Sequence, residues 1–222
     1  MHILDLLFPP RCVGCGKIGN YFCKSCVAHI ERISQQICPV CARPALDGRT
    51  HIRCLTSYGL DGMYAAVYFR GPIKKAIHLL KYQHVYDIVP SIIEMFDISF
   101  FSSLPPFDFL TPVPLHPSRE KERGFNQSLL LAQGLGERIH VPVIPTSLER
   151  VENTKSQADL SLEDRKKNTR NAFIVGSKKE LTGKCLGLVD DVGTTRATLS
   201  ECAKVLKRNG VKIVWAIVVA HG

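Results

Sequence analysis

The chain has 222 residues, and its 29 lysines and arginines exceed its 20 aspartates and glutamates, which gives a formal net charge of +9. This length suits either one domain with a sizeable core or a medium domain joined to a small module that needs outside help to fold. The longest apolar run, residues 213–220, has the length of a strand and excludes a helix that spans a bilayer. The basic balance favours partners that carry phosphate, although a solvated basic face would give the same composition.

The N-terminal stretch MHILDLLFPPRC has no basic start and reaches two prolines after only a few apolar residues. It therefore does not resemble a secretory signal peptide. We expect a soluble, cytoplasmic protein without membrane insertion. In that reducing compartment, paired CxxC units are more often metal ligands than disulfides.

Seven of the nine cysteines lie in the first quarter of the chain, and their doublet spacing predicts structural zinc. The first predicted site, a closed site of four cysteines, consists of Cys12, Cys15, Cys23 and Cys26. The second, of three cysteines and one histidine, consists of Cys38, Cys41, His51 and Cys54. Three alternatives stay open: a surface histidine at position 51, ligands that interleave between the sets, and free buried cysteines. The expected number of zinc ions is one or two.

The cysteine pattern ends near residues 56–58, which predicts a zinc-binding module of the double zinc ribbon type at 1–57 and a larger domain at 58–222. Metal would supply most of the folding free energy of so small a module. Such modules hold loops against nucleic acid, a protein partner or a neighbouring domain. The remaining cysteines, Cys185 and Cys202, lie in apolar surroundings and are expected to fill the core.

Apolar strands and helices alternate through the larger domain. Strands are predicted at residues 64–69, 109–114, 141–144, 185–189 and 211–219. A helix is expected to begin at Pro72, a second to be capped by Asn126 with Leu130, Leu131, Gly134 and Leu135 buried, and a third to span 198–208, with Gly210 at its C-terminal cap. This order predicts an α/β fold with a parallel sheet that is covered on both faces.

Polar clusters follow three of these strands, at residues 115–127, 150–171 and 190–198. In parallel sheets, ligands bind at the carboxyl ends of the strands, which is where these clusters fall. The middle cluster is a long charged insertion, which in a compact domain favours a lid over a simple connector.

The stretch LVDDVGTTRATL carries the clearest chemical signal. Asp190 and Asp191 can accept hydrogen bonds from vicinal ribose hydroxyls. Thr194, Thr195 and Thr198, with backbone N–H groups at a helix start, can cradle a phosphate. The alternative is an ordinary helix cap with acidic residues that favour the helix dipole, which explains one aspartate and one threonine but not the whole run.

This stretch is similar to the phosphoribosyl pyrophosphate (PRPP) loop of type I phosphoribosyltransferases. Together with PVPLHPSREKERGFNQS, LERVENTKSQADLSLEDRKKNTRNAF and the cysteine module, it resembles the ComF family of competence-associated proteins over essentially the full chain. The resemblance implies a type I phosphoribosyltransferase fold, PRPP or a related phosphorylated sugar as ligand, and Mg²⁺ that binds with it. The zinc module would stand where related transferases carry an acceptor-binding hood.

The resemblance also implies roles for particular residues. Asp190 and Asp191 would orient the ribose as catalytic residues, and Arg119 and Arg123 would hold pyrophosphate. The implied PRPP loop comprises Asp190, Asp191, Gly193, Thr194, Thr195, Arg196, Ala197 and Thr198. The implied lid carries Arg150, Gln157, Arg165 and Asn168. No general base for the acceptor is implied.

Two functions are consistent with these features. The first is an enzyme that transfers phosphoribose from PRPP to an unidentified acceptor. The second is a factor for DNA uptake in competence that binds single-stranded DNA through the basic zinc module, with PRPP or a nucleotide as regulatory ligand only and a competence helicase as partner. Salt-dependent binding to DNA would favour the second.

Arg196 departs from the pattern of the PRPP loop, which has glycine at this position. We expect Arg196 to adopt a right-handed helical conformation in the first helical turn, with Thr194 or Thr195 as N-cap. Its N–H group would then still face the phosphate, and the guanidinium would cover it. The alternative is a cradle with spoiled geometry.

Overall fold

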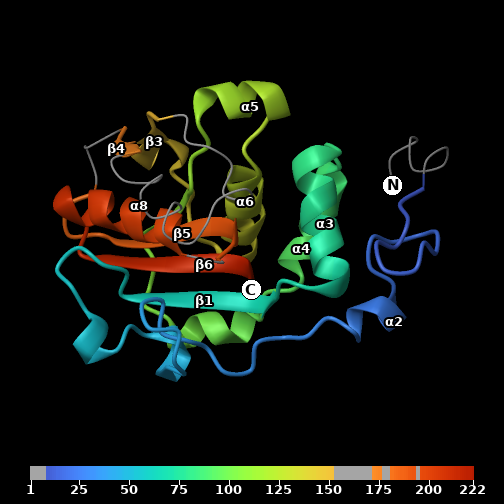
Figure 1. Cartoon of the computed structure of the whole chain (residues 1–222), viewed down its shortest axis with the longest axis horizontal. Helices are drawn as coiled ribbons and strands as arrows, with labels where there is room; N and C mark the ends of the chain where they lie inside the picture. The colour runs from blue at the N-terminus through green and yellow to red at the C-terminus, as the bar shows by residue number, and fades with distance from the viewer. Residues whose placement is uncertain (1–8, 153–171, 177–180, 194–195) are drawn as a thin grey trace.

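A parallel sheet forms the centre of the larger domain in the computed structural model, which describes residues 9–152, 172–176, 181–193 and 196–222 (Figure 1). Within these residues the sheet has four strands in the order β1-β6-β5-β2, and every neighbouring pair is parallel. The strands are β1 (Gly62–Tyr68), β2 (Phe109–Pro112), β5 (Cys185–Val192) and β6 (Ile213–His221). The predicted parallel α/β class is confirmed.

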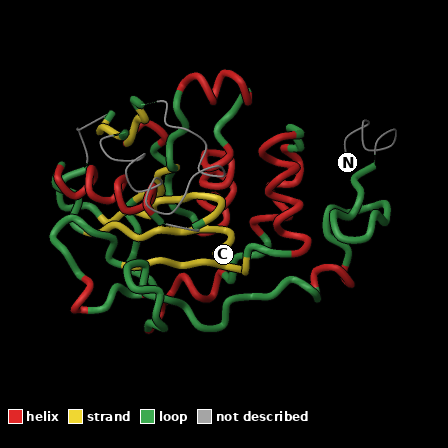
Figure 2. Tube along the Cα trace, in the orientation of Figure 1, coloured by secondary structure: helices red, strands yellow, loops and turns green. Residues whose placement is uncertain are grey.

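Helices cover both faces of this sheet (Figures 1 and 2). Helices α3 (Gly71–Tyr82), α4 (Val89–Ile93) and α6 (Gln127–Ile139) pack on one face and α8 (Ala197–Arg208) on the other. The described residues also form α2 (Lys24–Val27) and α5 (Pro117–Arg123), which lie away from the faces of the sheet. Alternate residues of β6 serve two cores: Trp215 and Ile217 pack with α3, α4 and α6, whereas Val214 and Ala216 pack with α8. The strand therefore reads as continuously apolar because it is buried on both faces.

Short 3₁₀ turns connect these elements. They span Leu46–Gly48, Ile52–Cys54, Tyr86–Ile88, Ile98–Ser103 and Pro145–Ser147. Asn126 caps α6 as predicted, because its side chain accepts a hydrogen bond from Ser128 N at 2.9 Å. The buried face of α6 is displaced from the predicted one: Leu131 and Leu135 are buried, whereas Leu130 and Gly134 are only half-buried.

The strand predicted at residues 141–144 is wrong. This segment makes a single parallel bridge to β2, between Leu110 and Val143, with hydrogen bonds from Leu110 N to Pro142 O at 2.8 Å and from Ile144 N to Leu110 O at 2.9 Å. Pro142 and Pro145 have no N–H group to donate, so the pairing cannot extend in either direction.

A second, two-stranded sheet stands beside α8 (Figure 1). It is the antiparallel pair β3 (Leu148–Arg150) and β4 (Phe173–Val175), which the sequence pattern did not predict. Most of the predicted lid lies between these two strands in the sequence. The lid positions Gln157, Arg165 and Asn168 lie outside the described residues.

The second half of the cysteine module runs along the exposed edge of β1 (Figure 1). The buried Gln36 side chain makes the two hydrogen bonds that a neighbouring strand would make: its Nε2 donates to Ala65 O and its Oε1 accepts from Ala65 N, both at 3.0 Å. Ile33 N and Glu31 O extend this pairing to Ala66 O and Tyr68 N at 3.1 and 3.0 Å. An edge strand covered in this way cannot pair with another chain.

None of the helices in the part of the chain that the structure describes combines the length and apolar character that a bilayer crossing demands.

Candidate functional site

The cysteine module brings its ligands together as two separate clusters. Cys12, Cys15, Cys23 and Cys26 form the first, and Cys38, Cys41, His51 and Cys54 form the second; in each, the ligand atoms lie within 4.8 Å of one another. Burial alone would raise the pKa of Cys12, but backbone N–H groups of Cys23 and Cys15 outweigh it and lower that pKa to about 6. Four thiolates in the first cluster, and three thiolates with one imidazole in the second, fit structural zinc at this separation. Ligands that interleave between the two sets are thereby excluded.

His51 has the hydrogen bonding of a metal ligand and not of a surface histidine. Its Nε2 lies 3.0 Å from Pro44 O, and because a carbonyl only accepts, Nε2 carries the proton. Nδ1 is left unprotonated and lies 3.3 Å from Cys41 Sγ. A backbone carbonyl that fixes the imidazole in this way is the usual support of a zinc-bound histidine.

The paired aspartates occupy the carboxyl end of β5 and lie within the strand, not after it. Ser128 Oγ donates to Asp190 Oδ1 at 2.7 Å, and Asp191 N donates to the same oxygen at 2.9 Å. Burial, together with the charge of Asp191, raises the pKa of Asp190 to about 7. Asn126, which caps α6 and whose Nδ2 donates to Val113 O at 3.1 Å, places Ser128 in reach.

Lys81, which no sequence motif singled out, forms an ion pair with Asp191. The Asp191 side chain is only 4% exposed and that of Lys81 22%. Burial alone would lower the pKa of Lys81, but the Asp191 carboxylate outweighs it and raises that pKa. The sequence gives one indication of this role: Lys81 lies in the last turn of α3, next to the buried side of the helix.

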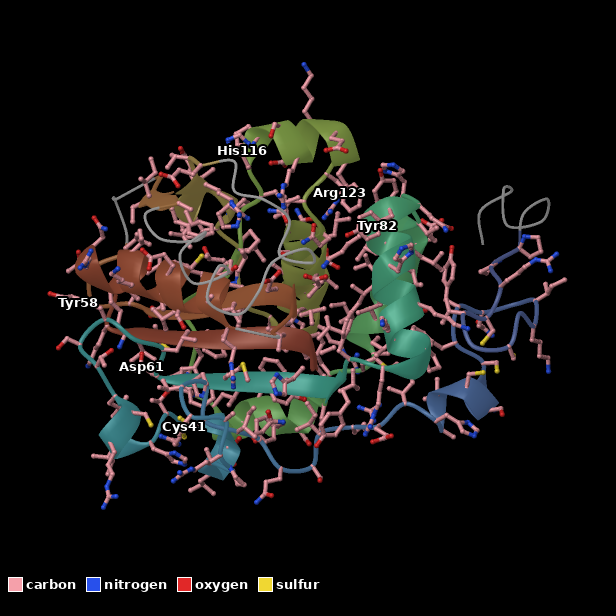
Figure 3. All side chains as sticks on the ribbon, in the orientation of Figure 1. Cys41, Tyr58, Asp61, Tyr82, His116 and Arg123 are labelled. Atoms are coloured by element: carbon pink, nitrogen blue, oxygen red, sulfur yellow. The ribbon has the colours of Figure 1, made fainter. Side chains whose placement is uncertain are left out.

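A cavity of about 350 Å³ adjoins this ion pair. Its lining residues are Lys81, Tyr82, His84, Arg119, Glu122 and Arg123. Arg123 and Tyr82 face each other from α5 and α3 (Figure 3), with the guanidinium 5.5 Å from the ring centroid. Arg123 also donates to Gln127 Oε1. The two arginines of the 115–127 cluster are thus brought to one wall with Lys81.

Arg150 lies apart from this cavity, in β3, and is buried with its guanidinium 5.4 Å from the Phe173 ring centroid. Burial, and next the charge of Arg119, lower the pKa of Arg150. The arginine therefore lies within electrostatic reach of the pyrophosphate residues that the resemblance implies.

The loop after β5 is anchored to the end of β6. Gly193 N donates to Ala220 O at 2.9 Å, and His221 Nδ1 donates to Gly193 O at 2.7 Å. His221 was missed because it belongs to a strand far along the chain. Ala197 and Thr198 form the first turn of α8, whereas Thr194 and Thr195 lie outside the described residues.

The predicted conformation of Arg196 is wrong. Arg196 is itself the N-cap of α8 and is left-handed, with φ 58° and ψ 5°. This is a conformation that glycine adopts freely and that other residues rarely adopt. Arg196 therefore has a backbone conformation that suits glycine.

Chemically, this edge of the sheet presents two kinds of group. The Asp190 and Asp191 carboxylates can accept hydrogen bonds from hydroxyls, and the cations around the cavity can hold phosphate oxygens. The N-terminus of α8, which follows the loop directly, adds backbone donors.

Comparison with known proteins gives relatives along nearly the whole chain. Residues 3–55 match the family model described as "Double zinc ribbon domain". The chain is 30% identical over 206 residues to "DNA utilization protein YhgH" of Escherichia coli, covering 89% of each protein. It is 30% identical to "Competence protein ComFC" of Bacillus subtilis, covering 85% of this chain and 78% of that one.

"Competence protein F" of Haemophilus influenzae is 40% identical over 111 residues, about half of each protein at 49% and 48%. A crystal structure of adenine phosphoribosyltransferase superposes with a TM-score of 0.38 and 8% identity, covering 64% of this chain and 75% of that one, a likeness too low to add to the assignment. With two relatives at 30% identity along most of their length and a zinc ribbon module in front, the chain belongs to the ComF family of competence-associated proteins.

Proposed function

We propose that the carboxyl edge of the sheet binds PRPP with Mg²⁺ and transfers its phosphoribosyl group to an acceptor. The observation that carries the proposal is the juxtaposition of Asp190 and Asp191 with Lys81, Arg119 and Arg123. These residues come from β5, α3 and α5, so three parts of the chain converge on one edge.

In the proposed reaction, the bond between the ribose C1 carbon and pyrophosphate breaks, and a bond from C1 to the acceptor forms. Asp190 and Asp191 would accept hydrogen bonds from the ribose hydroxyls and orient the ring. Arg119 and Arg123 would stabilise the negative charge that grows on the departing pyrophosphate. Carboxylate oxygens suit Mg²⁺, which when bound would add to that neutralisation.

The proposal extends to further residues. Arg150, Gln157 and Arg165 remain predicted lid residues, and the last two lie outside the described part. Gly193, Ala197 and Thr198 would bind phosphate with the threonines between them. We also propose that the chain divides at residues 57 and 58, with the zinc module beside the acceptor.

Calorimetric titration with PRPP and Mg²⁺ tests the site. The Asp190→Asn, Asp191→Asn double variant should bind at least about tenfold more weakly, because a carboxylate accepts stronger hydrogen bonds than an amide. Asp108→Asn is the matched control, since Asp108 pairs with Lys184 near the amino ends of the strands. Equal affinity in the folded double variant and the wild type would contradict the assignment.

A second candidate function is binding of single-stranded DNA. Tyr82, which lines the cationic cavity, is 58% exposed. Tyr86 is 44% exposed, lies beside the lining residue His84 and packs on Phe125 with ring centroids 4.7 Å apart. Aromatic faces beside arginines are what unpaired bases stack on. The name of the Escherichia coli relative refers to DNA utilization, which is consistent with this candidate.

Fluorescence anisotropy with a labelled oligonucleotide distinguishes the candidates. Binding that weakens steeply with salt and drops in Tyr82→Ala supports the DNA candidate. Tyr58→Ala is a matched control, because Tyr58 is 49% exposed and lies 5.5 Å from Arg208, as Tyr82 does from Arg123. Absence of binding even at low salt would remove this candidate and leave the phosphoribosyl proposal untouched.

A further inference from the structure

The backbone of Arg196 is the first of three observations that single out this residue. With φ at 58°, it occupies the left-handed region, which is unfavourable for a residue with a Cβ relative to its ordinary helical conformation. Glycine would avoid that cost. The backbone conformation therefore gives no reason for an arginine at this position.

The guanidinium of Arg196 is the second observation. Its Nη1 atom is buried, and no hydrogen-bond acceptor for it is found among the described residues. Burial lowers the pKa of Arg196, and the groups whose charges oppose this effect are Cys38 and Cys41. Both are ligands of the second cluster. The Nη1 end of this half-buried side chain is thus enclosed by protein, and the guanidinium lies within electrostatic reach of the metal ligands.

The third observation is continuous packing between the second cluster and the loop that leads to Arg196. Gly48, which lies between Cys41 and His51 in the chain, rests against the Met63 carbonyl so closely that a Cβ would collide. On the other side, a Cβ on Gly193 would lie 3.6 Å from Met63 Sδ. Met63 is fully buried and lies next to both glycines.

The charge of a loaded cluster explains why a cation belongs there. Three thiolates and one neutral imidazole around Zn²⁺ leave a single net negative charge. We propose that Arg196 is the charge partner of the second zinc cluster, so that the metal holds the loop after β5 and the start of α8 in place. Arg196 is then a positioning residue. The zinc ribbon and the carboxyl edge of the sheet form one unit through it.

This inference does not depend on the proposed phosphoribosyl site, because its test measures metal retention. The zinc-loaded full chain is mixed with a chromogenic chelator under native conditions, and zinc release is followed with time. Cobalt(II)-substituted protein assigns each phase, since a site of four thiolates and a site of three thiolates and one imidazole differ in absorption. Arg196→Gly removes the guanidinium and suits the left-handed backbone, so the fold is retained.

We expect Arg196→Gly to release the second zinc roughly tenfold faster, the usual effect of losing a residue that supports a metal ligand. Arg196→Lys, which keeps the positive charge, should restore much of the retention. Arg208→Ala is the matched control on the same helix, because this arginine lies over Tyr58 at the far end of α8. It should release both zinc ions at the wild-type rate.

Three results would overturn the inference. One is release from Arg196→Gly at the wild-type rate. Another is equal acceleration at both clusters, which would indicate general loosening. The third is a lysine variant as fast as the glycine variant, because charge would then not be the cause.

Discussion

The Asp190 carboxyl lies at the boundary between its neutral and charged forms. Burial and the neighbouring Asp191 raise its pKa to about 7 from an ordinary value of 3.8. The folded chain therefore holds a proton on Asp190 between about pH 4 and pH 7 that the unfolded chain has lost. The contribution of Asp190 to the free energy of unfolding is therefore most favourable near pH 4. It falls as the pH rises to about 7.

Asp190→Asn should remove this pH dependence. Since one pKa unit corresponds to about 1.4 kcal/mol, and since Asp190 is half-buried and not sealed from water, we expect the variant to gain on the order of 1–2 kcal/mol over the wild type between about pH 4 and pH 7. Urea unfolding at a series of pH values measures this difference. Parallel curves for the two proteins would contradict it.

Some residues of the candidate site can be predicted from the sequence, and others cannot. Asp190 and Asp191 are visible because they are adjacent and end an apolar strand. Lys81 and Ser128 reach them from α3 and α6, and His221 of β6 bonds the following residue Gly193, so only the tertiary fold brings these residues together. The left-handed conformation of Arg196 was missed because an arginine rarely adopts it, so the residue type favoured a right-handed one.

At the scale of elements, the edge of β1 depends on a side chain. Gln36 satisfies both the N–H and the carbonyl of Ala65 in the interior. A buried backbone group that loses its partner costs roughly 1–3 kcal/mol, so two such groups make this glutamine one of the more sensitive polar positions.

We expect Gln36→Ala to destabilise the protein by about 2–4 kcal/mol. Gln35→Ala is the control, because Gln35 is the exposed neighbour in the same segment. Chemical denaturation of both variants measures the effect. A change below about 1 kcal/mol for Gln36→Ala would show that water replaces the side chain at this edge.

The periodicity of the sequence located the long elements well, because β1, β5, β6 and α8 are uniformly apolar or amphipathic over at least seven residues. It failed where pairing depends on partners far along the chain. Strands β3 and β4 have three residues each and meet across more than twenty intervening positions. Residues 141–144 are apolar like a strand, but prolines on either side of Val143 limit them to one bridge.

At the scale of the whole molecule, the zinc ribbon is part of the structure of the larger domain and not an appendage. The half of the zinc ribbon that contains the second cluster supplies the hydrogen bonds along β1. The half that contains the first cluster contributes Phe22 and Val13 to the core that includes α3. Loss of metal from the second cluster should therefore destabilise the whole sheet.

Single-ligand variants distinguish the two ribbons. Cys41→Ser should lower the unfolding temperature of the whole chain by roughly 5–10 °C, as expected for a loss of a few kcal/mol in a domain of this size. Cys15→Ser, in the first cluster, should have a smaller effect, since that cluster does not cover the strand edge. Scanning calorimetry with zinc quantification on the same samples measures both. Equal shifts would contradict the unequal roles of the ribbons.

The ion pair between Lys81 and Asp191 has a consequence for motion. It joins the last turn of α3 to β5, and it occupies the same carboxylate that a cation or a sugar hydroxyl would approach. Any ligand that takes over Asp191 must release Lys81, and the end of α3 then loses its tie to the sheet. Amide hydrogen exchange at Leu79, Leu80 and Lys81 should accelerate when the edge is filled, even though the rest of the protein becomes better protected.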